Sequence, residues 1–263
     1  MTIEIIHRPA QGNARPVRLL FVHGISVGAW IWDLHFLAHF AELGYDCTAI
    51  SLRGHGKSAG RGQVREFSLG DFSADVAWAS RTMGAPHVII GHSLGGAVVQ
   101  NFIMRGGTPA GVALMMSVPP HGLLPSSISM YATNPGLWTE LRRSVAGSAR
   151  EADLGVIERN MFLNGAPATA GRLRDLMTEP AERASRDVMG MIPFAPMPWA
   201  MPKLLVMGGT QDRFIPASDA HLTAMYYGTR AIILNAAHAV MADFNWRVAA
   251  DALAYWLDEC FCE

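Results

Sequence analysis

The sequence predicts an α/β protein with a mostly parallel central sheet and helices on both of its faces. Short apolar runs alternate along the chain with segments of helical periodicity, as in successive βαβ units. Several runs lack the alternation of apolar and polar residues that marks a half-exposed strand, which is typical of a parallel sheet covered on both faces. Half of the 263 residues are hydrophobic and 16% are charged, so a large core can be buried.

Seven apolar runs are expected to be strands, with helices of crossover length between them. The first run, Ile3 to His7, is expected to form an antiparallel edge strand. The other predicted strands are Val17–Val22, Cys47–Leu52, His87–Ile90, Val112–Val118, Lys203–Met207 and Ala231–Leu234. The predicted helices are Trp30–Ala41, Leu69–Thr82, Leu94–Met104, Ala217–Tyr226 and Asp243–Leu257.

The interval from 119 to 201 contains no convincing strand. Its helical stretches, separated by proline and glycine, are Leu137–Val145, Leu154–Phe162, Ala170–Met177 and Ala181–Met191. A loop of this length without structure of its own is uncommon in a compact domain, and the proline-rich return segment FAPMPWAMP cannot continue a helix. We therefore expect a core made of residues 1–118 and 202–263, with a helical cap inserted late in the sheet at 119–201.

The charge balance excludes two classes of partner. Lysine and arginine number 21 against 22 aspartates and glutamates, a net charge of −1, which leaves no electrostatic footprint for nucleic acid or an anionic membrane. The longest stretch without these residues is interrupted by prolines and polar residues, so we expect no stable membrane insertion. The expected partner is small and uncharged or mildly charged, and the oligomeric state is left open.

Three cysteines, Cys47, Cys260 and Cys262, lack the spacing of a zinc site or a redox pair. We therefore expect no metal, and no cofactor is expected either. An odd number of cysteines in a long chain fits a reducing compartment, and the amino terminus lacks the basic start and apolar stretch of a signal peptide. These features predict a cytoplasmic protein.

The segment Gly91-His92-Ser93-Leu94-Gly95 has the pattern G-x-S-x-G and lies between a predicted strand and a predicted helix. Such a turn holds its serine in a strained conformation above the sheet, and the flanking glycines leave the room that the turn needs. The first N–H groups of the following helix point at the same place. Ser93 is therefore the candidate nucleophile and the Leu94 amide a candidate oxyanion donor, while His92 is interpreted as a packing or hydrogen-bonding residue.

A nucleophilic serine needs a base, an acid that orients the base, and a second oxyanion donor. The turn after the strand Val17–Val22 contains Ile25, whose amide is our candidate for that donor. Asp212 and His238 each follow a later strand, in the chain order Ser, Asp, His of one known triad architecture. Asp212 as a turn residue or helix cap, and His238 as a structural histidine, are the alternative interpretations.

Together these motifs resemble the α/β-hydrolase fold family, in its serine esterase or lipase-like branch with a helical cap. The similarity covers nearly the entire chain, including the RGHGKS segment at 53–58. It implies Ser93 as nucleophile, Asp212 as acid and His238 as base, with oxyanion amides at Ile25 and Leu94. Epoxide hydrolases and haloalkane dehalogenases of this family carry aspartate at the elbow, so the serine excludes their chemistry and leaves acyl transfer from an ester, thioester or lactone.

An apolar acyl or aryl group under the cap is the expected substrate feature. Ten of the fifteen methionines lie between Met115 and Met207, and methionine forms adaptable apolar walls. Ordinary packing of small cap helices by methionine is the alternative interpretation. Candidate substrate contacts are Ser26, His121, Trp138, Phe162 and Trp199.

The leading hypothesis is a serine hydrolase that cleaves a carboxylic ester with a hydrophobic moiety through an acyl-enzyme on Ser93. A second hypothesis is a non-hydrolytic member of the family, a cofactor-free dioxygenase, lyase or perhydrolase with His238 as base, since fold does not decide function. A third is a receptor for a small hydrophobic ligand in which the triad is vestigial.

Overall fold

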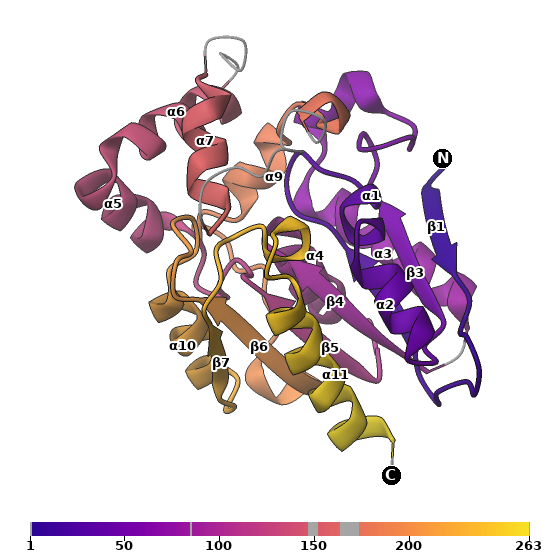
Figure 1. Cartoon of the computed structure of the whole chain (residues 1–263). Helices are drawn as coiled ribbons and strands as arrows, with labels where there is room; N and C mark the ends of the chain where they lie inside the picture. Colours follow the sequence, from indigo (N-terminus) through magenta and orange to yellow (C-terminus); the bar gives the residue numbers. More distant parts are fainter. Residues whose placement is uncertain (1, 85, 147–151, 164–173, 263) are drawn as a thin grey trace.

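The computed structural model describes residues 2–84, 86–146, 152–163 and 174–262 (Figure 1). Seven strands form one sheet in the order β1-β3-β2-β4-β5-β6-β7. Only the edge pair β1 and β3 is antiparallel, and every other neighbouring pair is parallel. The predicted fold class and the antiparallel edge strand are therefore confirmed. The strands are β1 Glu4–Arg8, β2 Arg18–Val22, β3 Cys47–Ser51, β4 His87–His92, β5 Gly111–Met115, β6 Lys203–Gly209 and β7 Ala231–Leu234.

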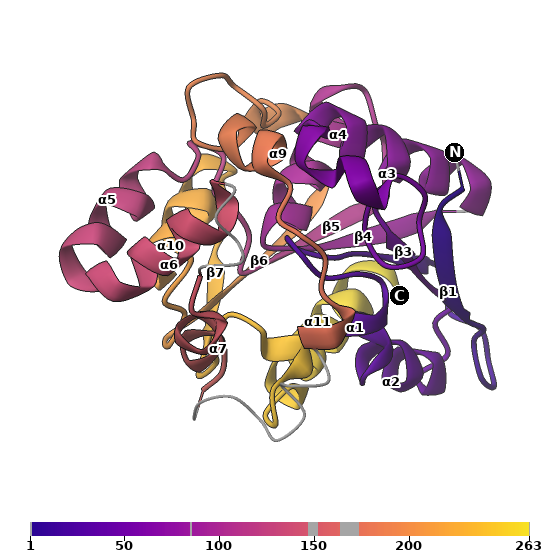
Figure 2. The same cartoon turned by 90° about the horizontal axis from the view of Figure 1, so that it is seen from above.

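Both faces of the sheet are buried under helices. In β2, Leu19 and Phe21 join the apolar core on one face while Leu20 and Val22 join the core on the other. All four side chains are fully buried, which explains why the strand sequence shows no alternation of apolar and polar residues. Figure 2 shows α3 (Leu69–Met83) and α4 (Leu94–Met104) on one side of the sheet. The opposite side carries α1 (Trp30–Asp33), α2 (Phe36–Glu42) and α11 (Arg247–Phe261).

In the described part of the chain between β5 and β6, four α-helices have both ends defined, and they lie within the interval where the sequence predicts a cap. They are α5 Leu124–Thr133, α6 Pro135–Val145, α7 Leu154–Met161 and α9 Glu182–Asp187. Figure 1 shows α5, α6 and α7 grouped to one side, away from the sheet. The helix α5 was not among the predicted helices. Its Pro125 lies in the first turn, where proline is well tolerated. Of the predicted helix Ala170–Met177, residues 170–173 lie outside the described residues, and 174–176 are helical.

Two predicted boundaries, the end of one strand and the start of the last helix, are wrong by a few residues. The strand predicted to run to Val118 ends at Met115, because Met116 has a φ of +44°, which a strand cannot contain. The last helix begins at Arg247 instead of Asp243. The carboxylate of Asp243 accepts hydrogen bonds from the backbone amides of Leu163 and Phe244, so this residue is fixed in the preceding turn.

The single helix predicted over Trp30–Ala41 is two helices. The chain leaves the helical conformation at His35, whose φ is −147°, and the His35 ring stacks on Trp246 at a centroid distance of 4.9 Å. The helix α10 (Ala217–Tyr226) agrees with its prediction and packs on β6 and β7. Three short 3-10 helices complete the described elements, at Arg61–Glu66, Pro198–Ala200 and Val240–Ala242. Among the described residues, no helix has both the length and the apolar character needed to span a membrane.

Candidate active site

The turn between β4 and α4 is a strained elbow with Ser93 at its tip. Ser93 has φ 52° and ψ −121°, a conformation that is costly for a residue with a side chain. A Cβ on Gly91 would lie 2.8 Å from the backbone oxygen of Gly95, and a Cβ on Gly95 would collide with the backbone oxygen of His23. The turn is therefore possible only because glycines flank the serine, as the sequence pattern predicts.

The structure brings the three candidate triad residues together in a hydrogen-bonded chain. The Ser93 Oγ lies 3.0 Å from His238 Nε2, and His238 Nδ1 lies 2.9 Å from Asp212 Oδ2. Because a carboxylate only accepts, Nδ1 carries the proton and Nε2 is the acceptor of the Ser93 hydroxyl. All three residues are less than a tenth exposed. The arrangement is that of a nucleophile, a base and an acid that orients the base.

The carboxylate of Asp212 is fixed by both of its oxygens. While Oδ2 faces His238, Oδ1 accepts hydrogen bonds from the backbone amides of Phe214 at 2.8 Å and Ile215 at 2.9 Å. These two amide hydrogen bonds hold the carboxylate in one orientation towards His238. The Phe214 ring also stacks on His238 at a centroid distance of 4.9 Å. Sequence reasoning missed both contacts of Phe214, although the residue lies only two positions after the predicted acid.

The Ile25 turn lies directly against the elbow. A Cβ on Gly24 would be 3.1 Å from the Cβ of Ser93. The turn is held by His23, whose Nδ1 donates to the Gly24 carbonyl at 2.7 Å and whose Nε2 accepts from the Leu52 amide at 2.9 Å. Complete burial, and then the neighbouring His55, hold the pKa of His23 well below its ordinary value, so the ring stays neutral.

The two candidate oxyanion donors are available for a ligand. Among the described residues, none accepts a hydrogen bond from the backbone amide of Ile25 or from that of Leu94. Ile25 lines the pocket beside Ser93, and Leu94 is the first residue of α4, where an N–H has no partner within the helix. Within the described part of the chain both amides thus lack an acceptor, as the predicted role of oxyanion donor requires.

His92, the residue before the serine, contacts the loop of the base. Its Nε2 lies 2.9 Å from the backbone oxygen of His238, which confirms its interpretation as a hydrogen-bonding residue. Burial, and then the proximity of His238, lower the pKa of His92 to about 3, so the imidazole is neutral at ordinary pH. A carbonyl oxygen only accepts, and Nε2 of His92 is therefore the protonated nitrogen.

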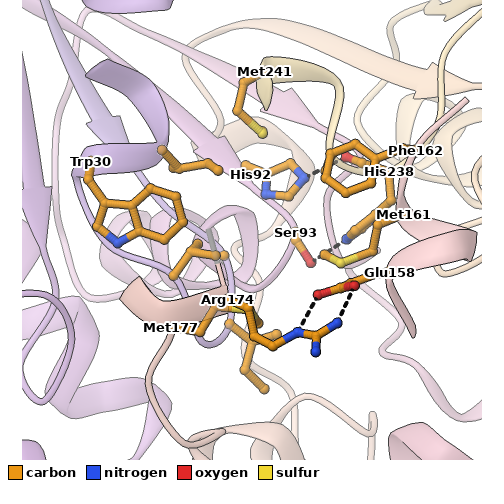
Figure 3. A pocket seen from close by; sticks show the side chains of 15 residues that line it. Trp30, His92, Ser93, Glu158, Met161, Phe162, Arg174, Met177, His238 and Met241 are labelled. Atoms are coloured by element: carbon orange, nitrogen blue, oxygen red, sulfur yellow. Dashed lines mark hydrogen bonds and ion pairs between the residues drawn. The ribbon is translucent and has the colours of Figure 1, made fainter. Parts of the chain in front are cut away.

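A cavity of about 60 Å³ opens beside Ser93. Figure 3 shows Trp30 on one side of this pocket and Met161 and Phe162 on the other, with Met241 at its end. The wall is mainly apolar. It is formed by turns at the carboxyl ends of strands and by residues of α7 and of the segment that follows it. The described lining residues are Gly24, Ile25, Val27, Trp30, Ile31, His92, Ser93, Glu158, Met161, Phe162, Arg174, Met177, His238, Ala239 and Met241.

Of the five candidate substrate contacts, Phe162 alone is found among the described lining residues. The other four are absent from the described wall of this pocket, and their contact with a substrate stays a prediction. Ser26 has a φ of +63° and is part of the turn, where its carbonyl accepts from the Thr178 amide at 2.8 Å. Trp199 is 80% exposed on the proline-rich return segment.

His121 and Trp138 lie in other contacts. His121 is exposed and its Nε2 is 3.9 Å from Asp219 Oδ1, an ion-pair distance at the start of the interval between β5 and β6. The Trp138 ring packs edge-on against Tyr131 and lies under the guanidinium of Arg142. These positions depend on how the helices between β5 and β6 pack on the rest of the protein. The spacing of aromatic residues in the sequence does not predict that packing.

The sheet order, the elbow and the hydrogen-bonded serine, histidine and aspartate define the class of α/β proteins built around a nucleophile elbow. The sequence profile of the Alpha/beta hydrolase family matches residues 19–252. The chain therefore belongs to the α/β-hydrolase family.

Two curated relatives match part of the chain. A non-heme haloperoxidase of Rhodococcus erythropolis is 33% identical over 112 residues, which cover 41% of this chain and 39% of that protein. A non-heme chloroperoxidase of Burkholderia pyrrocinia is 31% identical over 125 residues, 45% of this chain and 43% of that protein. The match thus spans less than half the length of these relatives.

Similar solved structures cover nearly the entire chain. An esterase from Exiguobacterium antarcticum has a TM-score of 0.72 at 13% identity, covering 97% of this chain and 95% of that one. The enol-lactonase from Burkholderia xenovorans LB400 has a TM-score of 0.68 at 17% identity, with 97% and 96% covered. A bromoperoxidase from Bacillus anthracis has a TM-score of 0.68 at 16% identity, with 97% and 95% covered. At such identities the similarity is one of fold.

Proposed function

We propose that the protein is a serine hydrolase that cleaves carboxylic esters through an acyl-enzyme on Ser93. The observation that carries the proposal is the buried hydrogen-bond chain from Ser93 through His238 to Asp212. A serine hydroxyl is a weak nucleophile on its own, and an adjacent base that is itself oriented by a carboxylate activates it.

In the first half of the reaction, His238 Nε2 takes the hydroxyl proton while Ser93 Oγ attacks the ester carbonyl. The amides of Ile25 and Leu94 donate to the oxyanion, and one such donor contributes roughly 3 kcal/mol to lowering a barrier of this kind. The imidazolium then gives its proton to the departing alcohol. Asp212 stabilises the imidazolium throughout, as in other triads of this geometry.

In the second half, water takes the place of the alcohol. His238 removes a proton from the water, the oxygen attacks the acyl carbonyl, and the proton returns to Ser93 Oγ as the acid leaves. A thioester or a lactone would react by the same steps with a thiol or an internal alcohol as leaving group.

The pocket favours a short acyl chain. A cavity of about 60 Å³ with walls from Trp30, Met161 and Phe162 has room for a small apolar group next to the serine. Longer chains need rearrangement of these side chains, of which the methionine is the most adaptable.

Active-site labelling tests the proposal. Wild-type protein should react with a fluorophosphonate probe, and Ser93→Ala should not, while Ser73→Ala, which removes a buried serine on α3, should label normally. In parallel, p-nitrophenyl esters from acetate to octanoate should show an optimum at a short chain. A folded wild type that neither labels nor hydrolyses any of these esters would contradict the proposal.

The descriptions of the two curated relatives favour a second candidate, a perhydrolase that uses the same acyl-enzyme. Hydrogen peroxide would replace water: His238 takes one peroxide proton, the peroxide oxygen attacks the acyl carbonyl, and a peracid leaves as the proton returns to Ser93. The peracid would then oxidise bromide to hypobromous acid and become the carboxylate. Bromination of phenol red that requires an ester or acetate, peroxide and an intact Ser93 would support this candidate.

A further inference from the structure

The pocket beside Ser93 contains one pair of opposite charges in an otherwise apolar wall. Among the described lining residues, Glu158 on α7 is the only carboxylate and Arg174 the only guanidinium. Arg174 Nε donates to Glu158 Oε1 at 2.8 Å, and Arg174 Nη2 donates to Glu158 Oε2 at 2.5 Å. The pair therefore has the two-pronged geometry that guanidinium and carboxylate prefer.

The unused hydrogen-bonding capacity of this pair lies on the arginine. Both oxygens of Glu158 are engaged and its side chain is 15% exposed, whereas the side chain of Arg174 is 45% exposed. A guanidinium has five N–H donors, and the bonds to Glu158 use one on Nε and one on Nη2. No described residue accepts from Nη1 or from the other Nη2 hydrogen. With respect to the described residues, a second edge of the guanidinium, which has the geometry to bind a carboxylate, is therefore open.

Glu158 prepares this edge by holding the guanidinium in one orientation. An arginine that is already fixed loses less side-chain freedom when it binds a ligand. Its hydrogen bonds to Glu158, and the charges of Asp153 and Asp175 nearby, raise the pKa of Arg174, so the guanidinium stays charged. These carboxylates also cancel much of its long-range field, so any recognition must come from direct contact.

We propose that the open edge of Arg174 binds a carboxylate of the substrate, so that the preferred substrates are esters or lactones carrying a second, anionic carboxylate. This inference rests on the proposed ester hydrolysis at Ser93. In the view of Figure 3 the Glu158 carboxylate lies between Ser93 and the guanidinium. The nitrogen of Arg174 that is not bonded to Glu158 lies on the side of the guanidinium away from Ser93 (Figure 3), so a substrate has to extend past Glu158 to place its carboxylate there.

Three methyl esters of similar length test the inference, with hydrolysis followed by proton release: monomethyl adipate, methyl hexanoate and methyl 6-aminohexanoate. We expect kcat/KM for the anionic ester to exceed that of the neutral one by about tenfold, mainly through KM. Arg174→Gln should abolish this preference, so that the anionic ester and methyl hexanoate are hydrolysed with similar kcat/KM. Arg159→Gln removes the same charge from an exposed position of α7 outside the pocket wall and should keep the preference.

The variant Glu158→Gln tests whether the guanidinium of Arg174 binds the substrate carboxylate without the negative charge of Glu158. It removes the competing carboxylate and leaves the guanidinium, so the preference for the anionic ester should be retained or increased. Equal rates for all three esters, with hydrolysis that depends on Ser93, would overturn the inference and leave the proposed function standing. A preference for methyl 6-aminohexanoate would also overturn it, because the recognising group would then be Glu158.

A binding measurement keeps the test independent of catalysis. Adipate should bind to Ser93→Ala about tenfold more tightly than to the double variant Ser93→Ala, Arg174→Gln when followed by titration calorimetry. Equal binding to the two proteins would overturn the inference whether or not the wild type hydrolyses esters. A wild type that cleaves no ester but binds adipate through Arg174 would refute only the proposed function.

Discussion

The imidazole of His92 donates its Nε2 hydrogen to the backbone oxygen of His238 over 2.9 Å, so the residue before the nucleophile holds the loop that carries the base. The same two rings lie 4.9 Å apart between centroids. The positions of nucleophile and base are thus linked by a contact that is separate from the hydrogen bond between them.

Removal of this contact should slow the reaction without weakening substrate binding. We expect His92→Leu to lower kcat by about ten- to a hundredfold with KM within about threefold, because small displacements of catalytic groups cost up to about a hundredfold. His92→Gln, whose amide can donate to the same carbonyl, should recover most of the rate. Equal losses in both variants, with an unchanged pH profile of kcat/KM, would assign His92 a packing role only.

Replacement of the acid should affect catalysis far more than folding. In Asp212→Asn the side-chain oxygen can still accept from the amides of Phe214 and Ile215, which are bound to Oδ1 in the structure. The amide nitrogen would then face His238 Nδ1 and favour the tautomer with its proton on Nε2, which cannot accept from Ser93. We expect kcat to fall by about 10⁴, as for this change in another triad.

Steady-state kinetics and thermal unfolding check the Asp212 prediction together. The melting temperature should stay within a few degrees of the wild type, and KM should change little. A kcat reduced by less than tenfold would show that His238 does not depend on Asp212 for its orientation.

Short sequence patterns were sufficient to predict the elbow at Ser93 and the two partners of the serine. The G-x-S-x-G pattern defines a turn that only glycines at its flanks permit, and the structure shows that turn at Ser93. Asp212 and His238 were identified because each follows a strand, and parallel strands bring their carboxyl ends to one edge. Their hydrogen bonds are consistent with that expectation.

The pocket wall could not be predicted in the same way. Phe162 was expected to line it and does, but Trp138 and Trp199 do not. The difference lies in how the helices between β5 and β6 dock on the sheet, which depends on long-range packing. The ion pair of Glu158 and Arg174 joins residues sixteen positions apart, and no sequence periodicity indicates that they meet beside Ser93.

The elbow glycines should be among the least replaceable residues of the chain. A Cβ on Gly95 would collide with the backbone oxygens of Val22 and His23, which cannot move without breaking β2 or its turn. We expect Gly95→Ala to lose several kcal/mol of unfolding free energy, as overpacking against backbone exceeds the ~1–3 kcal/mol typical of core side chains.

A second glycine provides the matched control for Gly95. A Cβ on Gly62 meets no atom within 4 Å, and Gly62 lies in the 3-10 helix Arg61–Glu66. Gly62→Ala should leave stability unchanged or raise it by up to ~1 kcal/mol through the unfolded state. Urea unfolding of both variants measures the contrast, and equal stabilities would show that the elbow has more room than the structure indicates.

Stability should fall steeply as the pH drops below about 6.5, because buried histidines are neutral in the folded state. Burial lowers the pKa of His55 to about 4 and that of His92 to about 3, from an ordinary value of 6.5. Between those values the unfolded chain binds protons that the folded protein does not, so the unfolding free energy decreases as the pH falls. Each histidine contributes up to ~1.4 kcal/mol per pH unit in this window and nothing above it. The urea concentration at the unfolding midpoint should therefore be lower at pH 5 than at pH 6, and equal at pH 7.5 and pH 8.5.

The variant His55→Phe, which keeps a ring packed against Phe72, tests the contribution of His55. Below pH 6.5 the slope of its unfolding free energy against pH should be smaller than that of the wild type by the equivalent of about one proton. An unchanged slope would mean that His55 is protonated in the folded protein.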